Sequence, residues 1–173
     1  MSTIVVGVAD CKVSAALCDQ VTTYALGSCI GLAVYDPQAR VGGLLHFMLP
    51  DSGIATQGER NPYKFADTGI PRLIEETCAL GAAKRRLEAW AVGAASMLEI
   101  AGGFEIGKRN HQALRRIMWK AGMLLQGEAV GGNQSRSVRL DIATGNVWVQ
   151  EAGEERKLLQ PRRKGGDRWP IAS

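Results

Sequence analysis

The sequence predicts an α/β fold: a layered sandwich in which a mixed or antiparallel sheet system is covered on one side by two main helices. Two apolar runs, at residues 30–35 and 41–49, are separated by five residues, a pattern typical of paired and buried strands. Two later segments, 67–81 and 110–122, repeat apolar side chains at helical spacing. Short β-prone runs precede, separate and follow the two helical segments, so we expect strands at both ends of the chain.

Length and composition indicate one folded domain followed by a tail. The chain has 173 residues, of which 46% are hydrophobic and 22% charged, as in ordinary globular proteins. Residues 1–150 are expected to form the domain. Residues 151–173, with six basic and four acidic side chains, are expected to be a largely disordered tail. The first ten residues hold a five-residue apolar run and no basic leader, which predicts neither a signal peptide nor membrane insertion, and a cytoplasmic location is the default.

Charge and cysteine content exclude several classes of function. The net charge of +4 is modest, and the basic residues of 108–120 alternate with apolar ones, as on the solvated side of a helix. No nucleic-acid partner is therefore expected, and an acidic partner is the weaker alternative. The four cysteines show no CxxC spacing and only two histidines accompany them, so neither a disulfide framework nor a zinc site is supported.

The N-terminal part of the chain is expected to contain strands. Residues 4–8 form a β-prone run, whereas the alanines of 11–20 permit a short helix. Thr22-Thr23-Tyr24 is again β-prone and leads into Gly27-Ser28-Cys29. Small residues in that tripeptide allow a tight turn that brings backbone amides toward a ligand.

The two long apolar runs are expected to pair as a hairpin. Their connector, 36–40, begins with the turn-forming dipeptide Asp36-Pro37. The stretch that follows the hairpin, 50–62, is polar and irregular, and it is long enough to be a functional loop.

Both helical segments carry start and stop signals. Asp67 is expected to cap the first helix, although it could instead orient a substrate, and Gly81 follows as a stop. Asn110 is expected to cap the second helix, which Gly122 ends. The remaining strands are expected at 87–92, 123–130, 137–142 and 147–150.

Cys29 and His46 are the candidate catalytic pair. Cys29 lies at the start of the first hairpin strand and His46 near the end of the second, so antiparallel pairing would bring the thiol and the imidazole together. The thiolate is the nucleophile, and the imidazole is expected to lower its pKa and later to protonate the leaving group. Inert packing in the core is the alternative reading for each residue.

Further residues complete the candidate site. Thr22 or Thr23 could supply the hydroxyl that orients the imidazole. Ser28 either donates a hydrogen bond at the site or simply fills the turn. Asn133, with two glycines before it, either forms a wall of the cleft or belongs to a plain turn.

Four motifs carry a resemblance to a known family. They are TTYALGSCIGLAVYDPQARVGGLLHFMLPDS at 22–52, YKFADTGIPRLIEE at 63–76, IGKRN at 106–110 and VGGNQSRSV at 130–138. In this order they resemble the CheD family of chemoreceptor glutamine deamidases, and the likeness covers roughly residues 4–150. The block from Gly-Ser-Cys to His-x-Met-Leu-Pro is its most specific part.

The resemblance implies a fold, a reaction and a partner. CheD proteins resemble the catalytic domain of cytotoxic necrotizing factor toxins, and they use a Cys-His-Thr triad to convert glutamines of methyl-accepting chemotaxis receptors to glutamates. Carried over, the triad is Cys29, His46 and Thr23, which lies six residues before the cysteine. CheC-type phosphatases are a further implied partner and occupy the deamidase site.

The implied chemistry proceeds through a thioester and needs no metal or organic cofactor. Backbone amides around Gly27, Ser28 and Cys29 are the expected oxyanion donors. Two departures from the family pattern leave the triad intact but concern loop shape. Gly93-Ala94-Ala95 stands where the family commonly has Gly-Gly-Ala, and Ser135 stands where glycine is common.

Two other functions stay open at this point. One is a binding module that regulates a CheC-type phosphatase with little catalysis. The other is a cysteine deamidase or transglutaminase-like enzyme that acts on another protein. Deamidation and amine transfer share the thioester and differ in whether water or an amine resolves it.

Overall fold

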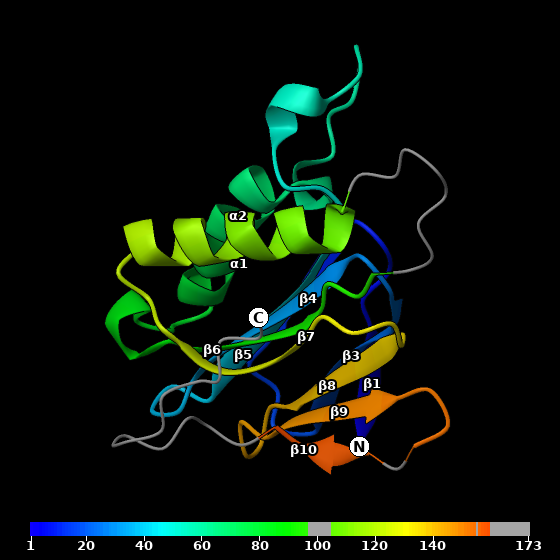
Figure 1. The fold of residues 1–173 in the computed structure, drawn as a ribbon. Coiled ribbons are helices and arrows are strands. Elements are labelled where there is room, and N and C mark those ends of the chain that lie inside the picture. The colour runs from blue at the N-terminus through cyan, green and yellow to red at the C-terminus, as the bar shows by residue number, and fades with distance from the viewer. Residues whose placement is uncertain (97–104, 155, 160–173) are drawn as a thin grey trace.

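The computed structural model describes residues 1–96, 105–154 and 156–159. Within these ranges the chain forms two five-stranded mixed sheets and two main helices, which confirms the expected α/β layered architecture. Figure 1 shows both helices on one side of the first sheet and the second sheet on its other side. None of the helices in the described ranges is long and apolar enough to cross a membrane.

The first sheet is central and contains the predicted hairpin. Its strands, in spatial order, are β2 (Asp10–Ser14), β5 (Val41–Phe47), β4 (Ile30–Asp36), β6 (Glu88–Gly93) and β7 (Leu125–Val130). The helices that cover it are α1 (Ala66–Ala79) and α2 (Ile106–Lys120). Three short 3-10 helices lie at Ser52–Ile54, Pro62–Lys64 and Lys84–Arg86.

The second sheet gathers strands from both ends of the chain. In spatial order they are β1 (Ser2–Val5), β3 (Asp19–Leu26), β8 (Arg136–Asp141), β9 (Val147–Glu151) and β10 (Lys157–Leu158). Strands β1 and β3 are parallel, as are β6 and β7, and the other pairs are antiparallel.

The predicted hairpin of β4 and β5 is confirmed. The two strands pair antiparallel from Ile30 opposite Phe47 to Asp36 opposite Val41. The Asp36 carboxylate accepts hydrogen bonds from the backbone N–H groups of Gln38 and Ala39, which fixes the connector as an Asx-type turn. All residues of both strands are buried because layers cover both faces, which explains why their sequences read as continuous apolar runs.

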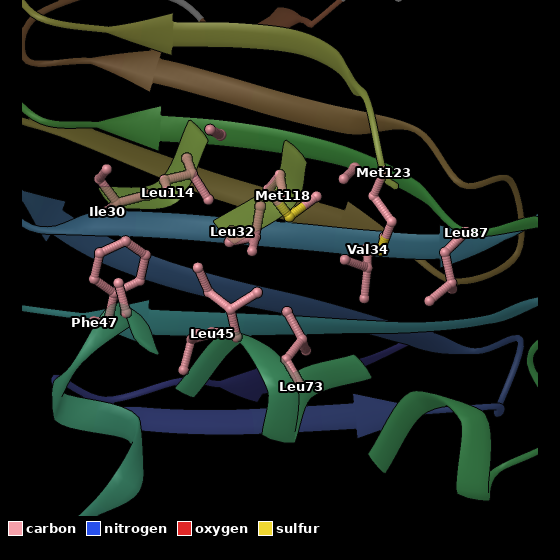
Figure 2. Close-up of a cluster of buried hydrophobic side chains, with 14 of the residues drawn as sticks. Ile30, Leu32, Val34, Leu45, Phe47, Leu73, Leu87, Leu114, Met118 and Met123 are labelled. Carbon is pink, nitrogen blue, oxygen red and sulfur yellow. The ribbon is translucent and has the colours of Figure 1, made fainter. Parts of the chain in front are cut away.

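Alternate residues of β4 enter two separate cores. Ile30, Leu32 and Val34 face the helices, and Figure 2 shows them in one cluster that also contains Leu73 of α1 and Leu114 of α2. Residues of the opposite parity, such as Ala33 and Tyr35, pack between the two sheets. The period of two along a strand therefore decides which residues reach the space between the sheets.

The expectation of a short helix in 11–20 is wrong. Residues 10–14 form β2, which pairs with β5, and β3 already begins at Asp19. Backbone pairing of β2 with β5 outweighs the helix propensity of the segment, and Ala15 and Ala16 lie in the short connector between β2 and β3.

Both predicted helix caps are also wrong. Helix α1 begins after Phe65, and Asp67 lies in its first turn, where its carboxylate accepts hydrogen bonds from the Ser52 N–H at 2.9 Å and the Ser52 hydroxyl at 2.6 Å. Helix α2 begins at Ile106, so Asn110 lies inside the helix and is fully buried. Asp67 and Asn110 are residue types that often cap helices, but here both side chains make hydrogen bonds to other parts of the chain.

The boundary at 150/151 stays a prediction. Glu151 completes β9, and β10 pairs with β9 through residues 157–158. Residue 155 and residues 160–173, which make up most of the expected tail, lie outside the described residues.

Candidate active site

Thr23 and His46 come from different sheets, and their side chains meet between them. Thr23 lies on β3 and His46 on β5, each about 1% exposed, and 2.8 Å separates Thr23 Oγ1 from His46 Nδ1. Thr22 does not contact the imidazole, because its hydroxyl donates to the carbonyl of Val138. Of the two threonines left open by the residues alone, Thr23 is the one beside His46.

The hydrogen bonds of Thr23 fix the tautomer of His46. A threonine hydroxyl has a single proton, and that of Thr23 is donated to the carbonyl of Val6 at 2.8 Å. Its oxygen can then only accept from the imidazole, so Nδ1 carries the proton and Nε2 carries the lone pair. Nε2 is buried and has no hydrogen-bond partner within the described residues. His46 Nε2 is therefore available to accept a proton in the space between the sheets.

Cys29 lies on the same face of the first sheet as His46. It directly precedes β4 and packs against the core between the sheets, to which Leu44, two residues before His46, also belongs. His46 is paired with Gly31, which makes Cys29 and His46 diagonal neighbours. Such neighbours lie roughly 7–8 Å apart along the sheet, within reach of an imidazole. No hydrogen bond joins the thiol to Nε2, and such bonds often tighten only when substrate binds.

Gly31 leaves the room that this geometry needs. A Cβ atom at this position would lie 2.9 Å from Val138 Cγ1 and 3.4 Å from Thr23 Cγ2. Both contacts are tighter than or at the limit of ordinary packing, so a larger residue opposite His46 would press on the Thr23 side of the site.

Burial acts on both candidate groups in a way that the sequence did not indicate. It raises the pKa of the Cys29 thiol, and a hydrogen bond from the backbone N–H of the same residue only partly opposes this. Burial also lowers the pKa of His46. Both shifts favour the uncharged forms, a thiol and a neutral imidazole, and the lowering of the thiol pKa by the imidazole stays a prediction.

The loop at 27–29 is held by three hydrogen bonds to its carbonyl oxygens. The Gly27 carbonyl accepts from the N–H of Ala95, and the Cys29 carbonyl accepts from the N–H of Ala94, both at 2.8 Å. The Ser28 carbonyl accepts from Asn110 Nδ2 at 2.9 Å. In the described part of the chain, the N–H groups of Ser28 and Cys29 have no acceptor other than the Cys29 thiol itself. The N–H of Ser28 thus has no partner among the described residues, and the N–H of Cys29 bonds only its own sulfur.

Gly93 and Ala94 bring β6 against this loop. Gly93 has a φ of +117°, and a Cβ atom there would lie 2.2 Å from the Cys29 carbonyl oxygen, so only glycine fits. Ala94 has a φ of +52°, a conformation that glycine adopts more readily. Alanine in place of the second glycine of Gly-Gly-Ala therefore keeps the hydrogen bond from Ala94 to the Cys29 carbonyl, but it strains the backbone at Ala94.

The loop before β8 lies beside the same segment. Gly131 N–H donates to the carbonyl of Gly93, and Arg136 donates to the Gly131 carbonyl at 2.6 Å. Asn133 itself is exposed, and its side chain makes no hydrogen bond within the described residues. Ser135 has no left-handed backbone conformation, so serine fits there without strain. The backbone carbonyl of Ser28 accepts a hydrogen bond from Asn110, and a role for its hydroxyl at the site stays a prediction.

Asn110 is the residue of this region that the sequence reasoning misassigned. It lies four residues before Leu114 and eight before Met118, on the same buried face of α2. A polar side chain on an apolar helix face was the signal that could have separated it from an exposed cap.

We predict that Cys29 reacts with iodoacetamide as a half-buried thiol without an activating partner. Because burial raises its pKa, the alkylation rate at Cys29 should be slow near pH 7 and should rise with pH up to and beyond 9. His46→Gln should leave this profile unchanged. Rates would be measured by peptide mass spectrometry, with exposed Cys18 in the same chain as comparator. A fast plateau at pH 6–7 that His46→Gln removes would show a thiolate–imidazolium pair instead.

The sequence model of the family described as "CheD chemotactic sensory transduction" matches residues 48–151. A probable chemoreceptor glutamine deamidase CheD from Solibacter usitatus is 57% identical over 169 residues, which cover 96% of this chain and all of the relative. The chemoreceptor glutamine deamidase CheD of Thermotoga maritima is 42% identical over 138 residues, 80% of this chain and 85% of the relative. The chain therefore belongs to the CheD family.

Proposed function

We propose that this protein hydrolyses the side-chain amides of specific glutamines in chemotaxis receptors to glutamate and ammonia. The relatives named as chemoreceptor glutamine deamidases support the substrate. Cys29 acts as the nucleophile, His46 as the general base and acid, and Thr23 as the group that orients the imidazole. The observation that carries the proposal is the unpartnered Nε2 of His46, on the sheet face that it shares with Cys29.

The first half of the reaction starts from the neutral pair. His46 Nε2 takes the thiol proton as Cys29 Sγ attacks the amide carbon of glutamine, and the carbonyl oxygen becomes an oxyanion. The N–H groups of Ser28 and Cys29 stabilise that charge. The imidazolium then gives its proton to the departing nitrogen, the C–N bond breaks, and ammonia leaves a thioester on Cys29.

The second half returns the enzyme to its starting state. A water molecule gives a proton to Nε2 and attacks the thioester carbon, and the C–S bond breaks as the proton returns to the sulfur. The receptor gains one negative charge. Thr23 keeps Nδ1 protonated throughout, so that Nε2 alone carries protons between the thiol, the leaving group and water.

We also propose that the fold is similar to the catalytic domain of cytotoxic necrotizing factor toxins, and the layered architecture supports this. A CheC-type phosphatase that covers the Cys29 loop is the corresponding proposal for a regulatory partner. Both follow from the family resemblance.

We predict that the wild-type protein deamidates cytoplasmic receptor fragments. Mass spectrometry should show a gain of about 1 Da at selected glutamines in ordinary water, and of about 3 Da in ¹⁸O water, because water resolves the thioester. Cys29→Ala should abolish the gain, whereas Cys18→Ala, at an exposed cysteine, should retain it.

Other outcomes of this assay separate the alternative functions. An unchanged receptor together with tight binding of a CheC-type phosphatase would favour the binding module. Incorporation of an added primary amine in place of oxygen would indicate a transglutaminase-like enzyme. Either result would contradict the proposed hydrolysis.

We predict a selective loss of turnover in Thr23→Val. This change removes the hydroxyl that fixes the His46 tautomer, and kcat should fall about 10- to 100-fold. Thr22→Val is the matched control, since Thr22 is also buried in β3 and also donates to a backbone carbonyl. The two variants should lose similar stability, about 1 kcal/mol each. Equal kcat values for the two variants would exclude an orienting role for Thr23.

A further inference from the structure

Asn110 joins the two segments that carry Cys29 and His46. Its side-chain Nδ2 donates to the Ser28 carbonyl at 2.9 Å and to the Met48 carbonyl at 2.8 Å. Ser28 directly precedes the cysteine, and Met48 follows the histidine by two residues. Both amide protons are used, so helix α2 is tied at once to the start of β4 and the end of β5.

The amide of Asn110 is held there despite an energetic cost. The residue is fully buried, and its Oδ1 has no hydrogen-bond partner in the described ranges. A buried acceptor without a partner destabilises a fold. The side chain therefore contributes through its two donated bonds, and one of these holds the loop that bears the sulfur.

The bond to Ser28 also sets the direction of a second group. The carbonyl of Ser28 and the N–H of Cys29 belong to the same planar trans peptide, in which the C=O and N–H bonds point in opposite directions. Holding the carbonyl on Asn110 therefore turns the Cys29 N–H away from α2. That N–H reaches the sulfur of its own residue, since it lowers the pKa of the thiol against the effect of burial. It therefore lies beside the attacking atom, where a backbone donor can reach an oxyanion formed at the substrate carbonyl.

We propose that Asn110 is a positioning residue that aims the Cys29 N–H at the oxyanion of the deamidation reaction. The inference rests on the proposed function. Asn110 touches no reacting atom and acts through the Ser28–Cys29 peptide. The bond from Ala95 N–H to the Gly27 carbonyl does the same for the Ser28 N–H, so each donor of the oxyanion site is aimed by a partner of the carbonyl in its own peptide.

The test compares Asn110→Leu and Asn110→Asp with Leu114→Ala. Leucine removes both donated bonds at similar volume, and kcat should fall about 10- to 100-fold, less than the 10²- to 10³-fold that loss of an oxyanion donor itself costs. KM for the receptor fragment should stay within about twofold, because the contact improves only in the transition state. Leu114→Ala, one turn along the same buried helix face, should keep kcat although it destabilises the fold.

A second readout separates positioning from general disruption. The probe is a receptor-derived peptide that the wild type deamidates, with the glutamine carboxamide replaced by an aldehyde. The Cys29 sulfur bonds to the aldehyde carbon and the thiol proton moves to the oxygen, which places that oxygen where the oxyanion forms. The inhibition constant in Asn110→Leu should weaken by about the same factor as kcat falls. The alkylation rate of Cys29 at pH 9 should change less than about threefold, because the sulfur itself stays in place.

The Asn110→Asp variant adds a pH dependence that a purely structural role would not. The wild-type amide donates two hydrogen bonds at every pH, whereas the carboxyl group of the variant can donate one bond while protonated and none once ionised. Relative to wild type at each pH, its kcat should therefore exceed that of Asn110→Leu at low pH and decline as the carboxyl ionises.

Three results would overturn the inference. They are a kcat for Asn110→Leu within twofold of wild type, an equal loss in Leu114→Ala, or an aldehyde inhibition constant that does not follow kcat. A wild-type chain that leaves the receptor unchanged would instead overturn the proposed function, and this inference with it.

Discussion

The hydrogen-bond chain from His46 through Thr23 to the Val6 carbonyl is the constraint on which the site depends. It links β5 of one sheet to β3 of the other, in a space that excludes water. An imidazole buried among apolar side chains needs a partner, and a partner with one proton already committed leaves the imidazole only one tautomer. The packing of the two sheets therefore sets the protonation state of a side chain that neither sheet could fix alone.

The Cys29 sulfur is positioned through hydrogen bonds to the backbone of its loop, not through a side-chain partner. The Cys29 loop has no regular secondary structure, yet each of its three carbonyls has a donor, from Ala95, Asn110 and Ala94. Binding the Gly27 and Ser28 carbonyls turns the N–H groups of Ser28 and Cys29 away from those partners, because each N–H points opposite to the carbonyl of its own peptide. Gly93 allows β6 to approach closely enough for this, since a Cβ atom would overlap the Cys29 carbonyl. The base is thus positioned by a side chain, and the nucleophile by its backbone.

The sequence predicted those parts of the structure that local patterns encode. The apolar runs and the Asp36-Pro37 turn were sufficient to predict the hairpin. The hairpin in turn was sufficient to predict that Cys29 and His46 lie on neighbouring strands. The choice between Thr22 and Thr23 depends on how β3 packs across the gap between sheets, which no local pattern contains. Asn110 and Asp67 are residue types that commonly cap helices, and only their tertiary contacts show that they hydrogen-bond to Ser28 and Ser52 instead. The raised pKa of the Cys29 thiol likewise follows from burial, which the spacing of a motif does not show.

Measuring the protonation state of His46 tests most directly whether Thr23 fixes the tautomer of the imidazole. Nitrogen-15 NMR of the imidazoles distinguishes the two neutral tautomers and the imidazolium, and the chain has only two histidines, so His46→Gln assigns the signals. We predict a neutral His46 at pH 7 with the proton on Nδ1 and none on Nε2. A proton on Nε2, or an imidazolium at that pH, would contradict it.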